Sequence, residues 1–309
     1  MREARIALAV ARRVTDKDDP GPILAKAKEQ IARAARDRAD LVLFSEVFAT
    51  PARECSVKAV TEASQTVPGP VSEELAAAAR KHGLYVAFGM YRQDGPRVYN
   101  SLVLLDRAGK LAWTYDKTTP MAEEMIKGGI TPGAAPTAFD TDFGRIGAAI
   151  CFDINFLELG ELYQRQNVEL LLFSSAFPGG RLLDHWAIRY GLAVAGCTWY
   201  PDNRVIDCTG ATVGRTSDIL PCTTTTLNLN RRVVHMDGNM GKIEKMLAKY
   251  PGDVRVEDMR LEATCVITSL KKGLEVDELI REFEVERLPD YFDRVRQVRS
   301  RQGGMGLPT

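Results

Sequence analysis

The sequence predicts an α/β fold in which two mixed β-sheets stack face to face and helices cover the outer face of each sheet. Segments with strand and helix patterns alternate over about the first 230 residues, which is typical of βαβ units. Pairs of strand-like segments joined by short turns interrupt this alternation, for example at residues 98–115. A purely parallel, doubly wound sheet would contain fewer hairpins, so two mixed sheets fit the pattern better.

The individual elements follow from the spacing of their apolar residues. Segments that repeat apolar residues every three or four positions predict helices at residues 22–38, 71–82, 156–166 and 183–190. Short apolar runs predict strands at residues 5–14, 40–44, 84–91, 98–105, 110–115, 138–139, 145–150, 169–174, 192–198, 204–208 and 223–229. Turns that contain glycine separate several of these strands, as at Asp142-Phe143-Gly144.

The chain is predicted to contain one large domain and an extension. No internal repeat and no Ser/Gly-rich linker interrupts the sequence before about residue 235, so residues 1–235 are expected to form one domain. Charges of both signs are dense after this point, and residues 274–283 and 288–298 have the spacing of amphipathic helices. We therefore expect residues 236–309 to form an α-rich C-terminal extension that packs on the domain or on a partner subunit.

Composition excludes several classes of protein. The 41 Lys and Arg residues balance the 41 Asp and Glu residues, and no strong basic cluster is present, so nucleic acid is not an expected partner. The three histidines lie far apart in the sequence, which makes a His-rich zinc site improbable. A hydrophobic content of 45% is enough to build a full core.

The cysteines and the N-terminus predict a reducing compartment. The six cysteines include no CxxC pair and are too sparse for a disulfide scaffold. The apolar stretch at residues 6–11 is too short for a secretory signal, and no run approaches the roughly 20 apolar residues of a membrane span. We therefore expect a soluble cytoplasmic protein with no membrane partner, in which a special cysteine is more often catalytic than structural.

Three strand ends each present a reactive side chain. Glu46, Lys117 and Cys151 each follow an apolar run, and open α/β sheets bind their ligands at strand ends. A glutamate can deprotonate a thiol, a cysteine can act as nucleophile, and a lysine can lower the thiol pKa and stabilise an oxyanion. Taken singly, each residue is also compatible with a solvated loop or with inert core.

The surrounding motifs resemble those of the nitrilase superfamily, the carbon–nitrogen hydrolases. The resemblance spans roughly residues 4 to 230, and the motifs occur in the order of that family. They are Phe44-Ser45-Glu46, Tyr115-Asp116-Lys117, Thr131-Pro132-Gly133 and residues 139–158 around Cys151.

The resemblance implies a fold and a set of roles. It implies a four-layer αββα sandwich that commonly pairs into a homodimer or a higher homo-oligomer. Glu46 would be the general base and then acid, Lys117 the oxyanion stabiliser and Cys151 the nucleophile. A second glutamate would be Glu124 by its distance from residues 129–133, with Glu123 as the alternative.

Three further residues are candidates for substrate binding. The backbone N–H of Phe152 would help to hold the oxyanion, Ser174 would line the pocket, and Arg181 could hold a substrate carboxylate. The chemistry requires only a carboxylate, an ammonium and a thiolate, so no metal and no organic cofactor is expected.

Departures from the family motifs favour the amidase-like branch. Phe152-Asp153 follows the cysteine, where nitrile-cleaving members typically have Trp-Glu. Ile154 and Asn155 stand where members that act on N-carbamoyl amino acids tend to have arginine, and Leu157 replaces a common proline. The expected function is hydrolysis of a small amide to an acid and ammonia or an amine. N-carbamoyl hydrolysis, nitrile cleavage and acyl transfer remain alternatives, and a catalytically silent binding protein is the least favoured.

Overall fold

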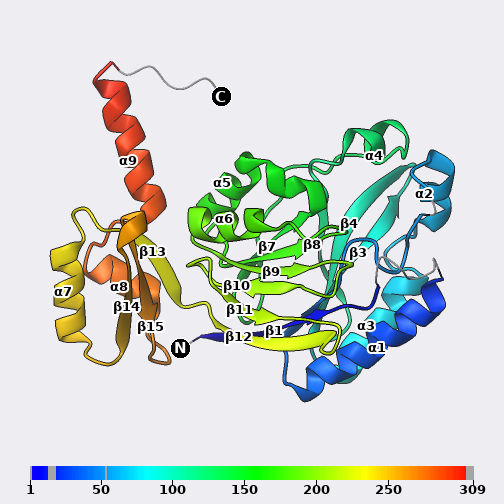
Figure 1. Cartoon of the computed structure of the whole chain (residues 1–309), viewed down its shortest axis with the longest axis horizontal. Coiled ribbons are helices and arrows are strands. Elements are labelled where there is room, and N and C mark those ends of the chain that lie inside the picture. The colour runs from blue at the N-terminus through cyan, green and yellow to red at the C-terminus, as the bar shows by residue number, and fades with distance from the viewer. Residues whose placement is uncertain (1, 13–18, 53, 304–309) are drawn as a thin grey trace. The chain divides into compact units, whose positions relative to one another are not determined.

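The computed structural model describes residues 2–12, 19–52 and 54–303, and this part of the chain divides into two compact units. One unit comprises Ala4–Leu227, and the other comprises the rest of the described chain. Figure 1 shows both units in ribbon form. None of the helices in the described ranges is long and apolar enough to cross a membrane.

The larger unit contains two six-stranded sheets. In spatial order, the strands of the first sheet are β12 (Cys222–Asn228), β1 (Glu3–Ala9), β2 (Leu41–Leu43), β3 (Tyr85–Asp94), β4 (Arg97–Leu105) and β5 (Leu111–Asp116). The strands of the second sheet are β11 (Thr212–Arg215), β10 (Arg204–Ile206), β9 (Ala193–Cys197), β8 (Leu170–Ser174), β7 (Arg145–Ile150) and β6 (Phe139–Asp140).

Each sheet is mixed and has a parallel centre. In the first sheet β1, β2 and β3 are parallel, and β4 and β5 continue as antiparallel hairpins. In the second sheet β7, β8 and β9 are parallel, and β6, β10 and β11 add antiparallel edges. Parallel strands end at the same edge of a sheet, so the segments after β2, β7 and β8 can converge there.

Side chains of the central strands alternate between two buried layers. Leu171 and Phe173 of β8 belong to the cluster beneath the outer helices of the second sheet. Leu172 and Ser174 point the opposite way, and the Ser174 hydroxyl donates a hydrogen bond to the carbonyl of Phe44 in the first sheet, at 3.1 Å. Because both faces are covered, these strands are continuously apolar in sequence.

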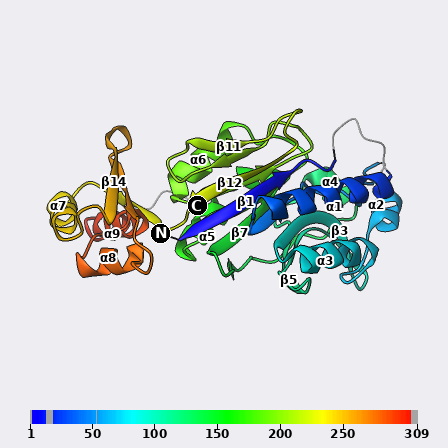
Figure 2. The ribbon, with the colours of Figure 1, turned by 90° about the horizontal axis from the view of Figure 1, so that it is seen from below.

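Helices cover the two outer faces. α1 (Pro20–Arg36) and α3 (Pro70–His82) pack together on the first sheet, and Figure 2 shows them side by side. α5 (Leu157–Arg165) and α6 (Arg181–Tyr190) pack on the second sheet, where the fully buried Trp186 lies between the helices and the sheet. The predicted four-layer sandwich of two mixed sheets is therefore confirmed.

Shorter elements connect these layers. They are α2 (Val57–Ala63), α4 (Ala122–Ile126) and a 3₁₀ turn, η1 (Cys151–Asn155). Neither α2 nor α4 was predicted, because seven and five residues are too few to show a clear helical period. The predicted strand at residues 5–14 is found as β1, and its residues 13 and 14 lie outside the described ranges.

The second unit combines a sheet with three helices. Its strands, in spatial order, are β13 (Arg231–His235), β15 (Thr264–Ser269) and β14 (Val254–Met259), and all pairs are antiparallel. Its helices are α7 (Met240–Lys249), α8 (Val276–Glu282) and α9 (Leu288–Arg301), and a short 3₁₀ turn, η2 (Arg260–Glu262), precedes β15.

The C-terminal segment therefore differs in part from its expected form. The two predicted helices are present as α8 and α9, but the sheet was not predicted. The division between the units falls after Leu227, whereas the sequence analysis placed it after residue 235. The difference is β13, which pairs with β15 and so belongs to the second unit.

Truncating a side chain between the two sheets should destabilise the larger unit. Leu172→Ala removes a fully buried side chain and should lower the free energy of unfolding by about 2–5 kcal/mol. Leu111→Ala, at a residue that is 49% exposed, is the control and should change it by less than about 0.5 kcal/mol. Urea unfolding followed by tryptophan fluorescence reports on this unit alone, because Trp113, Trp186 and Trp199 all lie within it. Equal losses in the two variants would contradict the assignment of an inter-sheet layer.

Candidate active site

Glu46 lies in a tight turn just beyond β2. Its neighbour Val47 has a φ of 37°, an uncommon conformation for a β-branched residue and one that is concentrated at functional sites. The turn packs against Gly89 of β3, where a Cβ atom would lie 2.6 Å from the Cα of Glu46. Only glycine therefore allows β3 to pass this close to the turn.

Lys117 follows β5 directly and is held by its main chain. Its N–H donates to the carbonyl of Asn100 at 2.8 Å, and its carbonyl accepts from the N–H of Gly133 at 2.9 Å. A Cβ atom on Gly133 would lie 2.2 Å from the carbonyl oxygen of Asp116. This close approach explains why glycine stands in the turn Thr131-Pro132-Gly133.

The Lys117 ammonium is buried between two carboxylates. Its Nζ lies 3.1 Å from Oε1 of Glu46 and 2.8 Å from Oε2 of Glu124, and the lysine side chain is 1% exposed. Burial by itself lowers the pKa of Lys117, but the negative charges of Glu46 and Glu124 outweigh burial and raise this pKa above its ordinary value. The side chain is therefore a fixed cation at neutral pH.

The carboxylate of Glu46 is held on both of its oxygens. Oε1 accepts from Nδ2 of Asn100 at 2.7 Å as well as from Lys117, and Oε2 accepts from the main-chain N–H of Ala176 at 2.8 Å. The indole of Trp199 donates to the main-chain carbonyl of Glu46 at 2.8 Å. These contacts fix the orientation of a carboxylate that is itself buried.

Asn100 joins the two glutamates and was not singled out from the sequence. Its Nδ2 donates to Oε1 of Glu46 and, at 3.2 Å, to Oε1 of Glu124. Its Oδ1 is buried and makes no hydrogen bond within the described residues. The carboxylates of Glu46 and Glu124 thus set the orientation of the Asn100 amide, and its own oxygen is left without a hydrogen bond within the described residues. In sequence, Asn100 is only one polar residue within a strand-like run.

The structure distinguishes Glu124 from Glu123. Glu124 contacts Lys117 and Asn100, and its Oε2 also accepts from the N–H of Met121 at 2.7 Å, which caps the start of α4. Glu123 is exposed, and its main-chain carbonyl accepts a hydrogen bond from the Cys55 thiol. The second carboxylate beside the lysine is therefore that of Glu124.

Cys151 is the first residue of η1 and directly follows β7. Its φ is 50°, a left-handed conformation that is unusual for a non-glycine residue. The thiol interacts electrostatically with Glu46, Lys117 and Glu124, and the Ser175 side chain is hydrogen-bonded to it. The three residues predicted at strand ends are thus brought together.

The Cys151 thiol does not have the lowered pKa that the sequence analysis expected from a neighbouring lysine. Burial, the largest cause, and the Glu46 charge raise the pKa to about 12, and they outweigh the lowering by Lys117 and by Ser175. At rest the side chain is a thiol. An attack on a substrate would need its proton to be removed in the same step.

The remaining predicted site residues lie at different depths. Phe152 is 37% exposed beside Cys151, and its ring packs against Phe156. Ser174 is buried between the sheets and donates to Phe44, so its neighbour Ser175 is the serine beside Cys151. Arg181 is exposed at the start of α6 and is not part of the described cluster.

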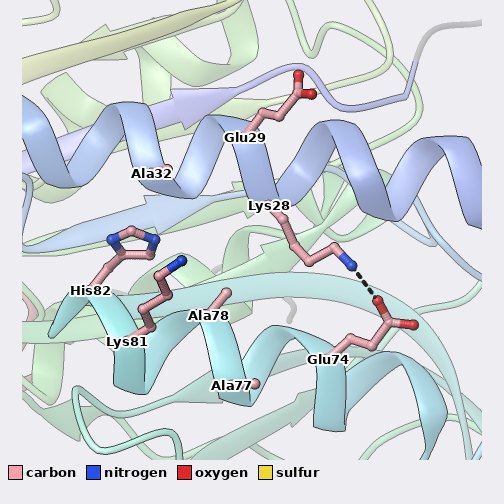
Figure 3. A pocket seen from close by; sticks show the side chains of 8 residues that line it. All are labelled: Lys28, Glu29, Ala32, Glu74, Ala77, Ala78, Lys81 and His82. Atoms are coloured by element: carbon pink, nitrogen blue, oxygen red, sulfur yellow. Dashed lines mark hydrogen bonds and ion pairs between the residues drawn. The ribbon is translucent and has the colours of Figure 1, made fainter.

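A groove on the outer surface lies away from these residues. It has a volume of about 480 Å³ and is lined only by residues of α1 and α3 (Figure 3). Lys28 and Glu74 form an exposed ion pair there, with their charged atoms 2.7 Å apart. None of the predicted site residues lines this groove, and we assign no function to it.

The arrangement combines groups with complementary chemistry. A carboxylate beside a thiol can act as a general base, and a permanent ammonium can stabilise an oxyanion. The two carboxylates and the single ammonium leave the cluster with one negative charge while the thiol is protonated.

The sequence of this chain is similar to that of several known proteins. The sequence profile of the family "Carbon-nitrogen hydrolase" matches residues 5–196. The omega-amidase NIT2 of Danio rerio is 28% identical over 174 residues, which cover 53% of this chain and 61% of that protein. The bifunctional nitrilase/nitrile hydratase NIT4A of Nicotiana tabacum is 32% identical over 151 residues, 44% of this chain and 43% of that protein. The matched part of the chain thus spans less than two thirds of the length of these relatives.

A solved structure shares the fold. The crystal structure of an amidase from Nesterenkonia sp. aligns with a TM-score of 0.61 at 22% identity and covers 72% of this chain and 90% of that chain. The family profile covers more than half of the chain, and its match contains Glu46, Lys117 and Cys151. This chain belongs to the carbon-nitrogen hydrolase family.

Proposed function

We propose that this chain hydrolyses a small amide to a carboxylic acid and ammonia or an amine, through a thioester on Cys151. The observation that carries the proposal is the buried Lys117 ammonium between Glu46 and Glu124, with the Cys151 thiol within electrostatic reach of all three groups. Family membership supports hydrolysis of a C–N bond, and the named relatives include an omega-amidase.

In the first half-reaction, Glu46 takes the thiol proton while Sγ of Cys151 attacks the carbonyl carbon. The carbonyl π electrons move to oxygen, and the oxyanion is stabilised by the Lys117 ammonium and by the backbone N–H of Phe152. Glu46 then gives its proton to the amide nitrogen as the C–N bond breaks. The amine leaves neutral, and a thioester remains on the sulfur.

In the second half-reaction, Glu46 takes a proton from water, and the oxygen of that water attacks the thioester carbonyl. The C–S bond breaks, Glu46 returns the proton to the sulfur, and the carboxylic acid leaves. Glu124 touches Lys117 but accepts no proton in this scheme. Its proposed role is to hold the ammonium so that one face remains directed at the oxyanion.

The substrate class is tested by a screen for ammonia release over small amides, N-carbamoyl compounds and nitriles. Cys151→Ala should abolish release from every active compound while its circular dichroism stays unchanged, because no other group replaces the nucleophile. Cys265→Ala, at a buried cysteine of the second unit, is the matched control and should retain full activity. An active Cys151→Ala protein would refute the proposal, and release from nitriles alone would move the assignment to nitrile hydrolysis.

A second experiment, on the products, separates hydrolysis from acyl transfer. Product analysis with and without an added amine nucleophile shows whether water or the amine takes the acyl group from the thioester. A product that appears only with the added amine would reassign the chain as an acyltransferase.

The pH profile of activity should stay flat from neutral into alkaline pH. Activity needs Glu46 as carboxylate, Lys117 as ammonium and Cys151 as thiol. The pKa of Lys117 is raised above its ordinary value and that of Cys151 is raised to about 12, so both residues keep their protons at alkaline pH. We expect kcat/KM to remain constant from about pH 7 up to about pH 9.5. A descending limb centred below about pH 9 would contradict these protonation states.

Asn100→Asp should inactivate the site without unfolding the chain. The change replaces a donor to Glu46 and Glu124 by a third carboxyl group, and we expect kcat to fall about 10²-fold, as for the loss of one oriented donor. Asn230→Asp is the control, because Asn230 is an equally buried amide in the second unit. Rates are compared per folded molecule, and equal losses in both variants would argue against a role of Asn100 at the site.

The pairing of two copies of this chain and its location in the cytoplasm stay predictions. α5 and α6 expose Leu157, Leu182 and Ile188 on the outer face of the second sheet, which supports the proposed pairing of two copies. Cys151 forms no disulfide, which suits the proposed reducing cytoplasm and leaves it available as a thiol.

A further inference from the structure

A buried carboxylate that the mechanism above does not use lies beneath the site. Asp153 is the third residue of η1 and is fully buried. Its side chain accepts four hydrogen bonds, from donors in or next to strands of both sheets, although it takes no part in the proposed reaction. Burial raises the pKa of Asp153, and hydrogen bonds from Tyr115, Ile150 and Thr119 act against that rise.

The four hydrogen bonds saturate the carboxylate. Oδ2 accepts from the Tyr115 hydroxyl at 2.7 Å and from the N–H of Ile150 at 2.9 Å. Oδ1 accepts from the N–H of Thr119 at 2.8 Å and from the Thr118 hydroxyl at 3.1 Å. A carboxylate has about four acceptor positions, so every one of them is used. An amide in its place would direct its NH₂ group at one of the present hydrogen-bond donors.

The donors are close in sequence to two of the proposed catalytic residues. Tyr115, Thr118 and Thr119 lie on either side of Lys117, at the end of β5 in the first sheet. Ile150 is the last residue of β7 in the second sheet and directly precedes Cys151. Asp153 is therefore a direct polar link between the segment that carries the ammonium and the segment that carries the thiol.

We propose that Asp153 is a positioning residue that fixes the separation between the Lys117 ammonium and the Cys151 thiol across the two sheets. Its importance for turnover rests on the proposed function, because the oxyanion must form between these two groups. Cys151 sits at a φ of 50°, and the bond from Ile150 to Asp153 closes its turn within the same segment. Displacement of reacting groups by about 1 Å can cost about 10²-fold in rate.

Two variants and a matched control test the link. Asp153→Asn replaces acceptors by a donor, and Tyr115→Phe removes only one of the four hydrogen bonds. Tyr163→Phe is the control. Tyr163 is as buried as Tyr115, and its hydroxyl is bonded to both the carbonyl and the N–H of Ala148, but none of the residues it bonds flanks Lys117. Its loss should cost similar stability while it leaves the separation unchanged.

The main readout needs no substrate. The rate at which iodoacetamide alkylates Cys151 is followed by mass spectrometry of the peptide that contains it, per folded molecule. Thiol reactivity depends on the nearby ammonium, so we expect the rate to fall about 10-fold in Tyr115→Phe and about 10²-fold in Asp153→Asn, and to change less than about 2-fold in Tyr163→Phe.

Turnover supplies the second readout. On any amide that the wild-type chain hydrolyses, kcat per alkylatable site should fall in the same order, with KM unchanged. Wild-type alkylation rates in folded Asp153→Asn and Tyr115→Phe would overturn the proposal, as would an equal loss in Tyr163→Phe, which marks a general loss of stability. If Asp153→Asn does not fold, the alkylation rate of Tyr115→Phe alone tests the proposal. An altered alkylation rate in a chain that hydrolyses no amide would refute the proposed function and leave the positioning role intact.

Discussion

The burial of the Lys117 ammonium between two carboxylates is the interaction on which the rest of the site depends. A lone ammonium at this depth would lose its proton or unfold its surroundings, because desolvation of a charge costs several kcal/mol. Glu46 and Glu124 offset this cost and keep the charge in place. The same two carboxylates need donors in turn, and Asn100 and the N–H groups of Ala176 and Met121 provide them.

This charge arrangement also sets the state of the nucleophile. The Glu46 carboxylate raises the pKa of the Cys151 thiol even as it stands ready to accept its proton. The site therefore keeps a neutral sulfur at rest, and in the proposed reaction the sulfur loses its proton to Glu46 as it attacks the substrate. A resting thiolate would be exposed to oxidants and alkylating agents, since thiolate character governs cysteine reactivity.

Sequence patterns predicted the frame of this protein better than its contacts. Apolar runs located the buried strands, and the motifs around Glu46, Lys117 and Cys151 identified residues that the fold brings together. Asn100 and Asp153 were missed because nothing in a linear sequence marks a buried polar residue whose hydrogen-bond partners come from distant segments of the chain. The direction of the Cys151 pKa shift was also missed, since its largest cause is burial, which the linear sequence does not show. The sheet of the second unit was missed because two of its strands, β13 and β14, are short and rich in charge.

The two-layer alternation of the central strands limits how the length of this chain can change. Deleting one residue within Leu170–Ser174 would turn every following side chain to the opposite face. Phe173 would then enter the space between the sheets, and the hydroxyl of Ser174 would face the apolar layer under α5 and α6. Insertions and deletions are therefore tolerated in the connecting loops and not in the central strands. The loops around the site can change in length while the strands keep the spacing of Glu46, Lys117 and Cys151.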